Sequence, residues 1–177
     1  MSYRAEVRTI LSSLSASRTV SGQLELSDVE LGEQPFRFEG PVAFDITLTN
    51  AGAGIVAEGT ASANLRTPCV RCLCDTTVAL TVDVEGFYVM PSRATEIPEE
   101  QDFELRADDM TVDLEPAVAQ SLIVELPYAP VHDEECRGIC PVCGADRNVE
   151  ECACASPGPA SPFDKLKDLQ LKNGDGA

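Results

Sequence analysis

The sequence predicts an α+β fold, in which an antiparallel β-sheet or a partly closed β-barrel packs against one helix and carries a small C-terminal Cys-rich zinc module. Three observations lead to this prediction. Apolar and polar residues alternate with period two between Val20 and Val89, as in half-buried antiparallel strands. Apolar residues recur every fourth position between Leu114 and Leu126, as on one face of a helix. All eight cysteines of the 177-residue chain fall into two clusters.

The predicted sheet rests on three strongly alternating segments, residues 42–48, 58–66 and 77–85. A turn with the sequence Asn-Ala-Gly-Ala-Gly at residues 50–54 joins the first two segments. A weaker alternation at residues 24–31 gives a candidate for one further strand. Because strands of this kind bury one face and expose the other, we expect a sheet with one covered face.

The first cysteine cluster, Cys69, Cys72 and Cys74, lies between the second and third of these segments. This position places the Cys-x-x-Cys pair at the tip of a hairpin that is held by a strand on each side. A loop on such a scaffold can be aimed at another element of the fold. We therefore expect the hairpin tip to meet ligands from another part of the chain.

A helix is expected at residues 114–126, with Asp113 as its N-cap and Pro116 in its first turn, where proline is tolerated. Pro127 and Pro130 end it. Its apolar stripe is expected to pack against the sheet rather than to form a groove for a partner. The stripe consists of Leu114, Val118, Leu122 and Leu126.

These elements divide the chain into three parts. Residues 1–130 are expected to form the antiparallel β domain with its helix, and residues 131–155 the Cys-rich zinc-knuckle module. Residues 156–177 are expected to form a flexible spacer, rich in Ser, Gly and Pro at its start, followed by a short tail helix. Within the first part, the acid-rich residues 91–109 are expected to form an exposed loop.

The charge of the chain bears on its partners. It carries 30 acidic and 13 basic residues, a net charge of −17. A protein that binds nucleic acid by itself neutralises phosphates with Lys and Arg, so direct RNA contact is disfavoured and a basic partner protein is favoured. The nucleic-acid alternative, a zinc ribbon, requires arginines near the cysteine pairs to converge in space. The arginines in question are Arg66, Arg71, Arg137 and Arg147.

The N-terminal residues bear on the compartment. Residues 1–13 lack the long apolar run of a signal peptide. No stretch of the chain approaches the roughly 18 apolar residues of a membrane span. We therefore expect a cytoplasmic protein without membrane contact. Because thiols stay reduced in the cytoplasm, paired cysteines there are more often metal ligands or catalytic groups than disulfides.

The cysteines and the single histidine supply ligands for one or two structural zinc ions, each of which needs four. Two residues between thiols let both sulfurs reach one tetrahedral ion. The glycine after Cys143 allows the tight turn of such a knuckle. The candidate ligands are Cys69, Cys72, Cys136, Cys140, Cys143, Cys152, Cys154 and His132.

Three groupings of these ligands are open. In the first, the last four cysteines share one ion, and the remaining three candidate cysteines join His132 around a second. In the second, Cys136, Cys140 and Cys143 share an ion with one of the last two cysteines. In the third, the two cysteines of the hairpin tip share an ion with Cys140 and Cys143. Cys74 is spare in all three, and His132, beside three acids, is equally well explained as a solvated, charge-paired side chain.

Redox chemistry is the main alternative to metal binding. A catalytic Cys-x-x-Cys pair opens a helix, whose N-terminus lowers the thiol pKa. Here the first pair lies in a hairpin and the second in a segment rich in Gly and Pro, so metal binding is favoured. The chain also lacks a phosphate-binding loop, a Gly-x-Ser-x-Gly motif and a defined pair of carboxylates. We therefore expect neither catalytic residues nor a small-molecule substrate.

Several motifs, in this order, resemble those of the YceD family, the large ribosomal RNA subunit accumulation proteins. They are Cys69-Val-Arg-Cys72-Leu, Asp113-Leu-Glu-Pro, Glu125-Leu-Pro-Tyr-Ala-Pro-Val-His-Asp-Glu-Glu-Cys136 and Ser161-Pro-Phe-Asp-Lys-Leu166. The stretch from Cys136 to Cys154 is similar to the cysteine-rich form found in many bacterial members. The resemblance extends over about residues 20–171.

The resemblance implies a cytoplasmic, non-enzymatic protein that is needed for large-subunit rRNA to accumulate. Together with the net charge of −17, it predicts that an acidic surface engages a basic ribosomal protein or a ribosome-assembly factor. A nucleic-acid-binding zinc ribbon and a thiol redox protein are the alternatives.

Overall fold

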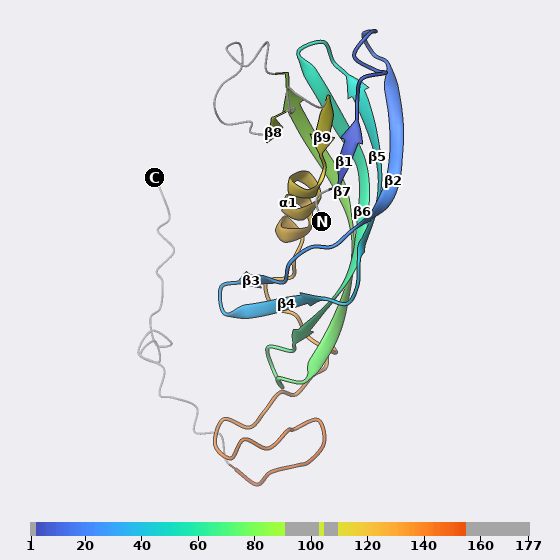
Figure 1. The fold of residues 1–177 in the computed structure, drawn as a ribbon. Helices are drawn as coiled ribbons and strands as arrows, with labels where there is room; N and C mark the ends of the chain where they lie inside the picture. The colour runs from blue at the N-terminus through green and yellow to red at the C-terminus, as the bar shows by residue number, and fades with distance from the viewer. Residues whose placement is uncertain (1–2, 91–102, 105–109, 155–177) are drawn as a thin grey trace, which may run out of the picture. The chain divides into compact units, whose positions relative to one another are not determined.

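The computed structural model describes residues 3–90, 103–104 and 110–154 (Figure 1). The chain forms two compact units, Met1–Cys136 and Arg137–Ala177. The division falls a few residues after the predicted border at residue 130. The predicted spacer and tail helix lie outside the described residues, as does nearly all of the predicted acidic loop.

The first unit is built on an antiparallel sheet of long strands (Figure 1). Four strands follow one another across it: β2 (Ser17–Leu24), β5 (Val42–Asn50), β6 (Gly54–Pro68) and β7 (Asp75–Val89). Continuous registers join them, with Phe44 opposite Ala61 and Ala61 opposite Val82. The three alternating segments of the sequence therefore form neighbouring strands, as predicted.

Shorter strands complete this sheet. The hairpin of β3 (Val29–Leu31) and β4 (Gln34–Phe38) pairs with β6 beyond the region that β5 covers, through Arg37 and Phe38. The short β8 (Phe103–Glu104) runs parallel to the end of β7. The candidate strand at residues 24–31 is divided between the end of β2 and β3. The described strands form an open sheet. The prediction of an antiparallel sheet is therefore confirmed, and the alternative of a partly closed β-barrel is not.

A second layer covers one face of the sheet. It consists of a two-stranded ribbon, β1 (Arg4–Glu6) with β9 (Thr111–Asp113), and of the helix α1 (Glu115–Val124). Two glycines of the sheet allow this layer to approach. A Cβ atom at Gly86 would lie 3.4 Å from that of Ala117 in α1. At Gly22 it would lie 2.9 Å from the ring of Tyr3, which packs edge-on against Phe44 with ring centroids 4.7 Å apart.

The helix is shorter than predicted. It begins with Leu114 at the N-cap, and Asp113 is the last residue of β9. Asp113 was therefore wrongly predicted as the N-cap, although its carboxylate accepts a hydrogen bond of 3.1 Å from the N–H of Glu115. The predicted stripe is buried, so its packing against the core is confirmed. Its members are Leu114, Val118, Leu122 and Leu126.

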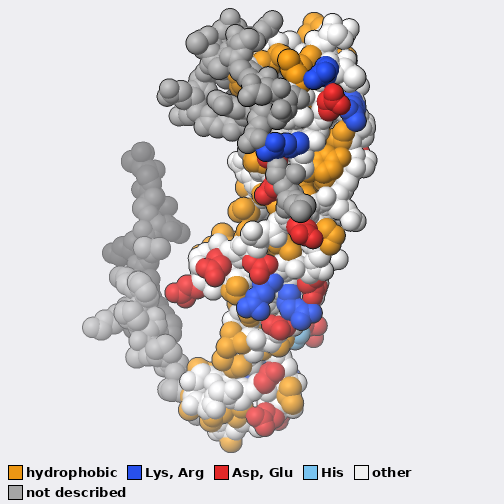
Figure 2. All heavy atoms as spheres, in the orientation of Figure 1, with side chains coloured by type: hydrophobic (Ala, Val, Ile, Leu, Met, Phe, Trp, Pro, Cys, Tyr) orange, Lys and Arg blue, Asp and Glu red, His pale blue; other side chains and the backbone are white. Residues whose placement is uncertain are grey.

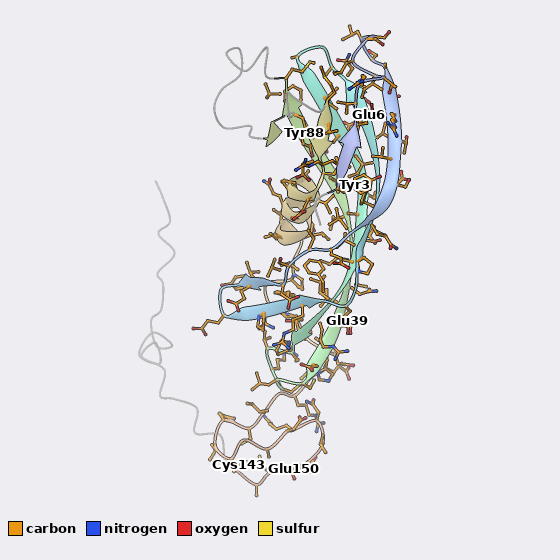
Figure 3. All side chains as sticks on the ribbon, in the orientation of Figure 1. Tyr3, Glu6, Glu39, Tyr88, Cys143 and Glu150 are labelled. Carbon is orange, nitrogen blue, oxygen red and sulfur yellow. The ribbon has the colours of Figure 1, made fainter. Side chains whose placement is uncertain are left out.

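Two buried side chains join other segments to the sheet: Asn50 holds the connection between β1 and β2, and Tyr88 holds β9. The amide of Asn50 donates hydrogen bonds to the carbonyls of Ile10 and Ser13, at 3.0 and 2.9 Å, and accepts one from the N–H of Gly52. The hydroxyl of Tyr88 donates to the carbonyl of Asp113 at 2.9 Å, and burial raises the pKa of Tyr88 well above its usual value. Figure 3 labels Tyr3 and Tyr88 in the part of the first unit that carries the second layer. Among the described residues, no helix has the length and apolar content that a bilayer crossing requires.

Candidate metal centres

The first cysteine knuckle, residues 69–74, closes the hairpin of β6 and β7. The N–H of Cys69 donates to the carbonyl of Cys74 at 2.8 Å, and the N–H of Leu73 donates to the carbonyl of Cys69 at 2.9 Å. Leu73 has a φ of 63°, in the left-handed region that non-glycine residues rarely adopt. The strands that carry this loop have 15 residues each, about 50 Å of extended chain.

The second knuckle, residues 140–145, repeats this backbone pattern in the second unit. The N–H of Cys140 donates to the carbonyl of Ala145, and the N–H of Gly144 donates to the carbonyl of Cys140, both at 2.8 Å. Gly144 has a φ of 75°. Leu73 thus occupies the position of Gly144, and Cys74 that of Ala145. The predicted glycine turn after Cys143 is present. The equivalent turn of the first knuckle could not be recognised in the sequence, because Leu73 stands where the second knuckle has a glycine.

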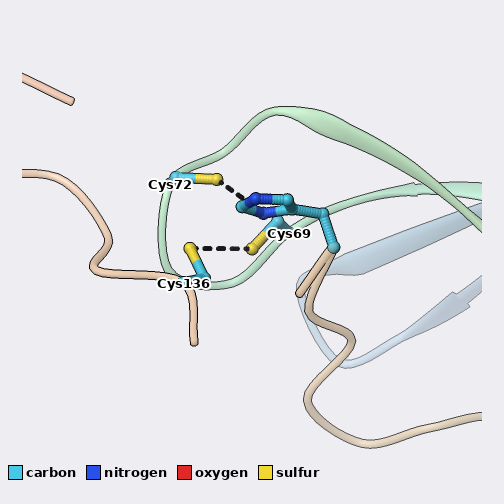
Figure 4. Close-up of side chains that lie close together, drawn as sticks. Cys69, Cys72 and Cys136 are labelled. Atoms are coloured by element: carbon cyan, nitrogen blue, oxygen red, sulfur yellow. Dashed lines mark hydrogen bonds between the residues drawn. The ribbon is translucent and has the colours of Figure 1, made fainter. Parts of the chain in front are cut away.

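Centre 1, as we call it, consists of Cys69, Cys72, His132 and Cys136, whose ligand atoms all lie within 4.8 Å of one another. The Sγ atoms of Cys69 and Cys136 lie 3.9 Å apart, and the Sγ of Cys72 lies 3.3 Å from Nδ1 of His132, as the dashed lines in Figure 4 mark. A tetrahedral zinc ion with Zn–S bonds of about 2.3 Å has edges of about 3.8 Å. The donor set therefore fits a zinc ion in size and chemistry.

Hydrogen bonds to backbone carbonyls of the segment with His132 and Cys136 hold it at the hairpin tip. The N–H of Val70 donates to the carbonyl of Pro130 at 2.9 Å. The guanidinium of Arg71 donates to the carbonyls of Glu134 and Cys136, at 2.8 and 3.1 Å. Arg71 therefore fixes the loop that carries two of the four ligands, a role that sequence reasoning missed. No sequence signal marks it, because the acceptors are backbone atoms.

Centre 2 consists of Cys140, Cys143, Cys152 and Cys154, again with all ligand atoms within 4.8 Å of one another. Two stretches of the second unit are paired by a bridge between Ile139 and Asp146 and by a hydrogen bond of 2.7 Å from the N–H of Arg137 to Asn148 Oδ1. Four sulfurs around one point are a donor set typical of structural zinc.

The thiols of each centre differ in acidity. Although burial opposes ionisation of Cys69, hydrogen bonds from His132 and from the backbone N–H groups of the knuckle lower its pKa to about 5. The backbone N–H groups of Cys143 and Val142 lower the pKa of Cys140 to about 6. The first cysteine of each knuckle is therefore poised to bind as a thiolate.

Other thiols hold their protons more tightly. A hydrogen bond with the thiol of Cys74 raises the pKa of Cys72. A hydrogen bond with the thiol of Cys140 likewise raises the pKa of Cys152. The contact with Cys143 raises the pKa of Cys154 to about 12. Thiolates in so small a volume, three in centre 1 and four in centre 2, repel one another, and a divalent cation among them removes this repulsion.

Of the three groupings open in the sequence, the structure assembles the first, with one set of four ligand atoms in each unit. His132 is exposed and yet contacts Cys72, so its ring belongs to the cluster. Cys74 is outside both sets, but its sulfur lies 3.1 Å from that of Cys72. The helix among the described residues begins at Glu115, so neither Cys-x-x-Cys pair has the helix N-terminus of a redox site.

Fold and sites define an α+β protein with two cysteine-rich clusters that could each hold a metal ion. A model of the family described as Large ribosomal RNA subunit accumulation protein YceD matches residues 57–170. That range is more than half of the chain and includes all the candidate ligands, and the chain belongs to the YceD family. The predicted resemblance is thereby confirmed.

Relatives with curated sequences come from mycobacteria. Uncharacterized protein ML1660 of Mycobacterium leprae is 29% identical over 143 residues, 81% of this chain and 59% of the relative. Uncharacterized proteins Mb2951c of Mycobacterium bovis and Rv2926c of Mycobacterium tuberculosis are each 32% identical over 100 residues, 56% of this chain and 48% of the relative. The chain thus spans about half the length of these relatives. No solved structure matches it.

Proposed function

We propose that this protein is a non-enzymatic cytoplasmic factor that supports the accumulation of large-subunit rRNA and ribosome assembly. It acts through contacts between its acidic surface and a basic ribosomal protein or assembly factor. One zinc ion in each centre stabilises the elements that carry the cysteines. The observation that carries the proposal is the match of residues 57–170 to a family described by its role in rRNA accumulation.

Acidic side chains on the outer face of the sheet support the proposal of a basic partner. In the register of β5, β6 and β7, Asp45 and Asp83 flank Thr60, and in the next row Glu58 lies directly opposite Glu85. All four carboxylates are exposed. Like charges directly opposite each other destabilise a sheet. A basic partner that binds over these two rows would remove the repulsion and gain a complementary charge.

The arginines near the knuckles favour protein contact over RNA contact in the first unit. The guanidinium of Arg66 pairs with Glu39, with a shortest N–O distance of 2.6 Å. Arg71 donates to two backbone carbonyls. Figure 2 accordingly shows basic side chains next to acidic ones on the visible face of this unit, rather than in a basic patch of their own.

One observation supports RNA contact as a second candidate function. Arg137 and Arg147 line a common hollow in the second unit, together with Glu150, Glu151 and Cys152. Two guanidinium groups in one hollow can accept a phosphate, although the two glutamates oppose it. Binding of rRNA fragments that weakens steeply with salt would favour this second function.

Depletion of the protein tests the main proposal. We expect the ratio of large-subunit to small-subunit rRNA to fall and to recover with the wild-type gene. In sucrose gradients, the protein should sediment with large-subunit precursors at low salt and leave them at high salt. The double variant Glu58→Lys with Glu85→Lys should lose this association.

The matched control for the charge reversal is Glu25→Lys with Glu30→Lys, an equal change of charge at exposed positions outside the two acidic rows. Expressed in depleted cells, this control variant should restore the ratio of large-subunit to small-subunit rRNA. The proposal is wrong if depletion leaves the rRNA ratio unchanged and the protein stays in the top fractions at every salt concentration.

A further inference from the structure

A fourth thiol, that of Cys74, lies beside centre 1 without belonging to its set of four ligands, which contains three cysteines and His132. The Sγ of Cys74 lies 3.1 Å from that of Cys72, and Cys74 is exposed, whereas Cys69, Cys72 and Cys136 are buried. The knuckle fixes this arrangement. The carbonyl of Cys74 accepts from the N–H of Cys69, and the left-handed Leu73 turns the chain between the two thiols.

Centre 2 has no such thiol. Its knuckle has the same two backbone hydrogen bonds and the same left-handed residue, but the position of Cys74 is taken by Ala145. The backbone of a knuckle therefore does not require a cysteine there. The extra thiol distinguishes centre 1 from centre 2 and calls for a chemical role of its own.

We propose that Cys74 is an oxidation site, at which a peroxide forms a Cys72–Cys74 disulfide and thereby releases the metal ion from centre 1. The release of metal rests on the zinc role proposed above, whereas formation of the disulfide does not.

The reaction balances in two steps. The Cys74 thiol reduces hydrogen peroxide, which gives a sulfenic acid on Cys74 and one water molecule. The Cys72 thiolate then attacks the sulfenic sulfur, the S–S bond forms, and hydroxide leaves. Two thiols have supplied the two electrons that reduce the peroxide. Cys72 can then no longer bind the ion as a thiolate, so centre 1 loses one of its four ligands.

Accessibility decides which thiols react. A redox-sensitive cysteine is exposed to the oxidant and lies next to a resolving thiol. Cys74 meets both conditions at 3.1 Å from Cys72. The other close pair of centre 1, Cys69 with Cys136 at 3.9 Å, is buried on both sides. Within centre 1, the peroxide should therefore reach Cys74 first.

The test uses the full chain, loaded with zinc and freed of reductant. After addition of hydrogen peroxide, a chromogenic chelator measures released zinc, and mass spectrometry of alkylated peptides maps the disulfides. We expect the ion of centre 1 to leave, together with formation of a Cys72–Cys74 disulfide, and a dithiol reductant to reverse both. Cys74→Ser should release zinc from centre 1 about tenfold more slowly.

Two further variants serve as controls for this experiment. Cys74→Ala repeats the test with a different replacement, and Asp75→Ser changes the next exposed residue while it keeps the thiol. Asp75→Ser should behave like the wild type. The proposal is overturned if Cys74→Ser and Cys74→Ala release zinc as fast as the wild type, or if the mapped disulfide joins other cysteines.

The outcome separates this inference from the proposed zinc role. A chain that takes up no zinc contradicts the zinc role, but peroxide must still produce the Cys72–Cys74 disulfide in it. If the chain holds two ions and peroxide releases them at the same rate with and without the Cys74 thiol, only the oxidation site is contradicted.

Discussion

The two cysteine knuckles have the same backbone but different surroundings. Residues 69–74 close a hairpin of two 15-residue strands, and their centre draws His132 and Cys136 from a loop that Arg71 fixes. Residues 140–145 belong to a unit in which Gly138 and Cys140 are the buried residues among those described. In the first case a ladder of paired strands holds the loop in place, whereas in the second the ligands supply much of what is buried.

The residue in the left-handed position reflects this difference. The first knuckle has Leu73 there, at a conformational cost, and the second has Gly144 at almost none. Strained backbone persists only where the surrounding structure imposes it. The ladder between β6 and β7 does so at the first knuckle, since it continues to the pair of Pro68 and Asp75. The described part of the small unit, residues 137–154, has no such ladder, and a glycine meets the requirement there without strain.

Removal of metal should separate the two knuckles most strongly. Apparent binding energies of structural zinc in small zinc domains are about 10–16 kcal/mol, far more than so small a unit gains from burial. We expect a chelator to unfold the Cys140–Cys154 region and to leave the main sheet folded. Hydrogen exchange with and without the chelator measures this. Unchanged protection in both units, with no bound ion in native mass spectra, would contradict the zinc centres.

Loss of Arg71 should weaken only centre 1. Arg71→Ala removes two charge-assisted hydrogen bonds, and we expect a loss of about 2 kcal/mol, or about 30-fold in zinc affinity. Chelator competition measures the affinity, and cobalt spectra distinguish a site with one nitrogen from an all-sulfur site. Arg37→Ala, at an exposed position of β4, is the matched control. Equal affinities for both variants would show that Arg71 does not position the ligands.

Exchange of the left-handed residues should act in opposite directions. Gly144→Leu introduces strain of about 1–2 kcal/mol, and we expect about a tenfold weaker centre 2. Leu73→Gly removes strain, so centre 1 should bind zinc at least as tightly as before. The same competition assay measures both variants. A similar loss of affinity in the two centres would contradict the view that the hairpin imposes the conformation of Leu73.

The smallest effect is expected away from both knuckles, at Tyr88. Tyr88→Phe loses one buried hydrogen bond and should lower the free energy of unfolding by about 1 kcal/mol at neutral pH. The raised pKa means that the folded state favours the neutral phenol. This contribution is present below about pH 10 and is lost as the pH rises further.

Denaturant titrations at several values between about pH 8 and pH 11 measure this dependence. The stability of the wild type should fall more steeply at the alkaline end than that of Tyr88→Phe. Tyr128→Phe, at a tyrosine that is 88% exposed, should match the wild type throughout. Parallel curves for the wild type and Tyr88→Phe would contradict the buried, neutral phenol.

Much of the fold follows from the sequence alone. Period-two alternation determined the long strands, since each must bury one face, and the spacing of Leu114, Val118, Leu122 and Leu126 determined the buried stripe of the helix. The N-cap was misplaced because Asp113 pairs with Arg4 as the end of β9. Propensity favours aspartate at a cap, but a strand contact over a long sequence distance took precedence here.

The sequence also determined which residue types could bind metal, because thiols at Cys-x-x-Cys spacing reach one ion from a single loop. Only the tertiary structure decided their grouping. His132 and Cys136 join Cys69 and Cys72 through hydrogen bonds between backbone groups and Arg71, and no side-chain pattern records such contacts. For the same reason, only the structure places the sulfur of Cys74 beside that of Cys72, since a left-handed leucine brings the two together.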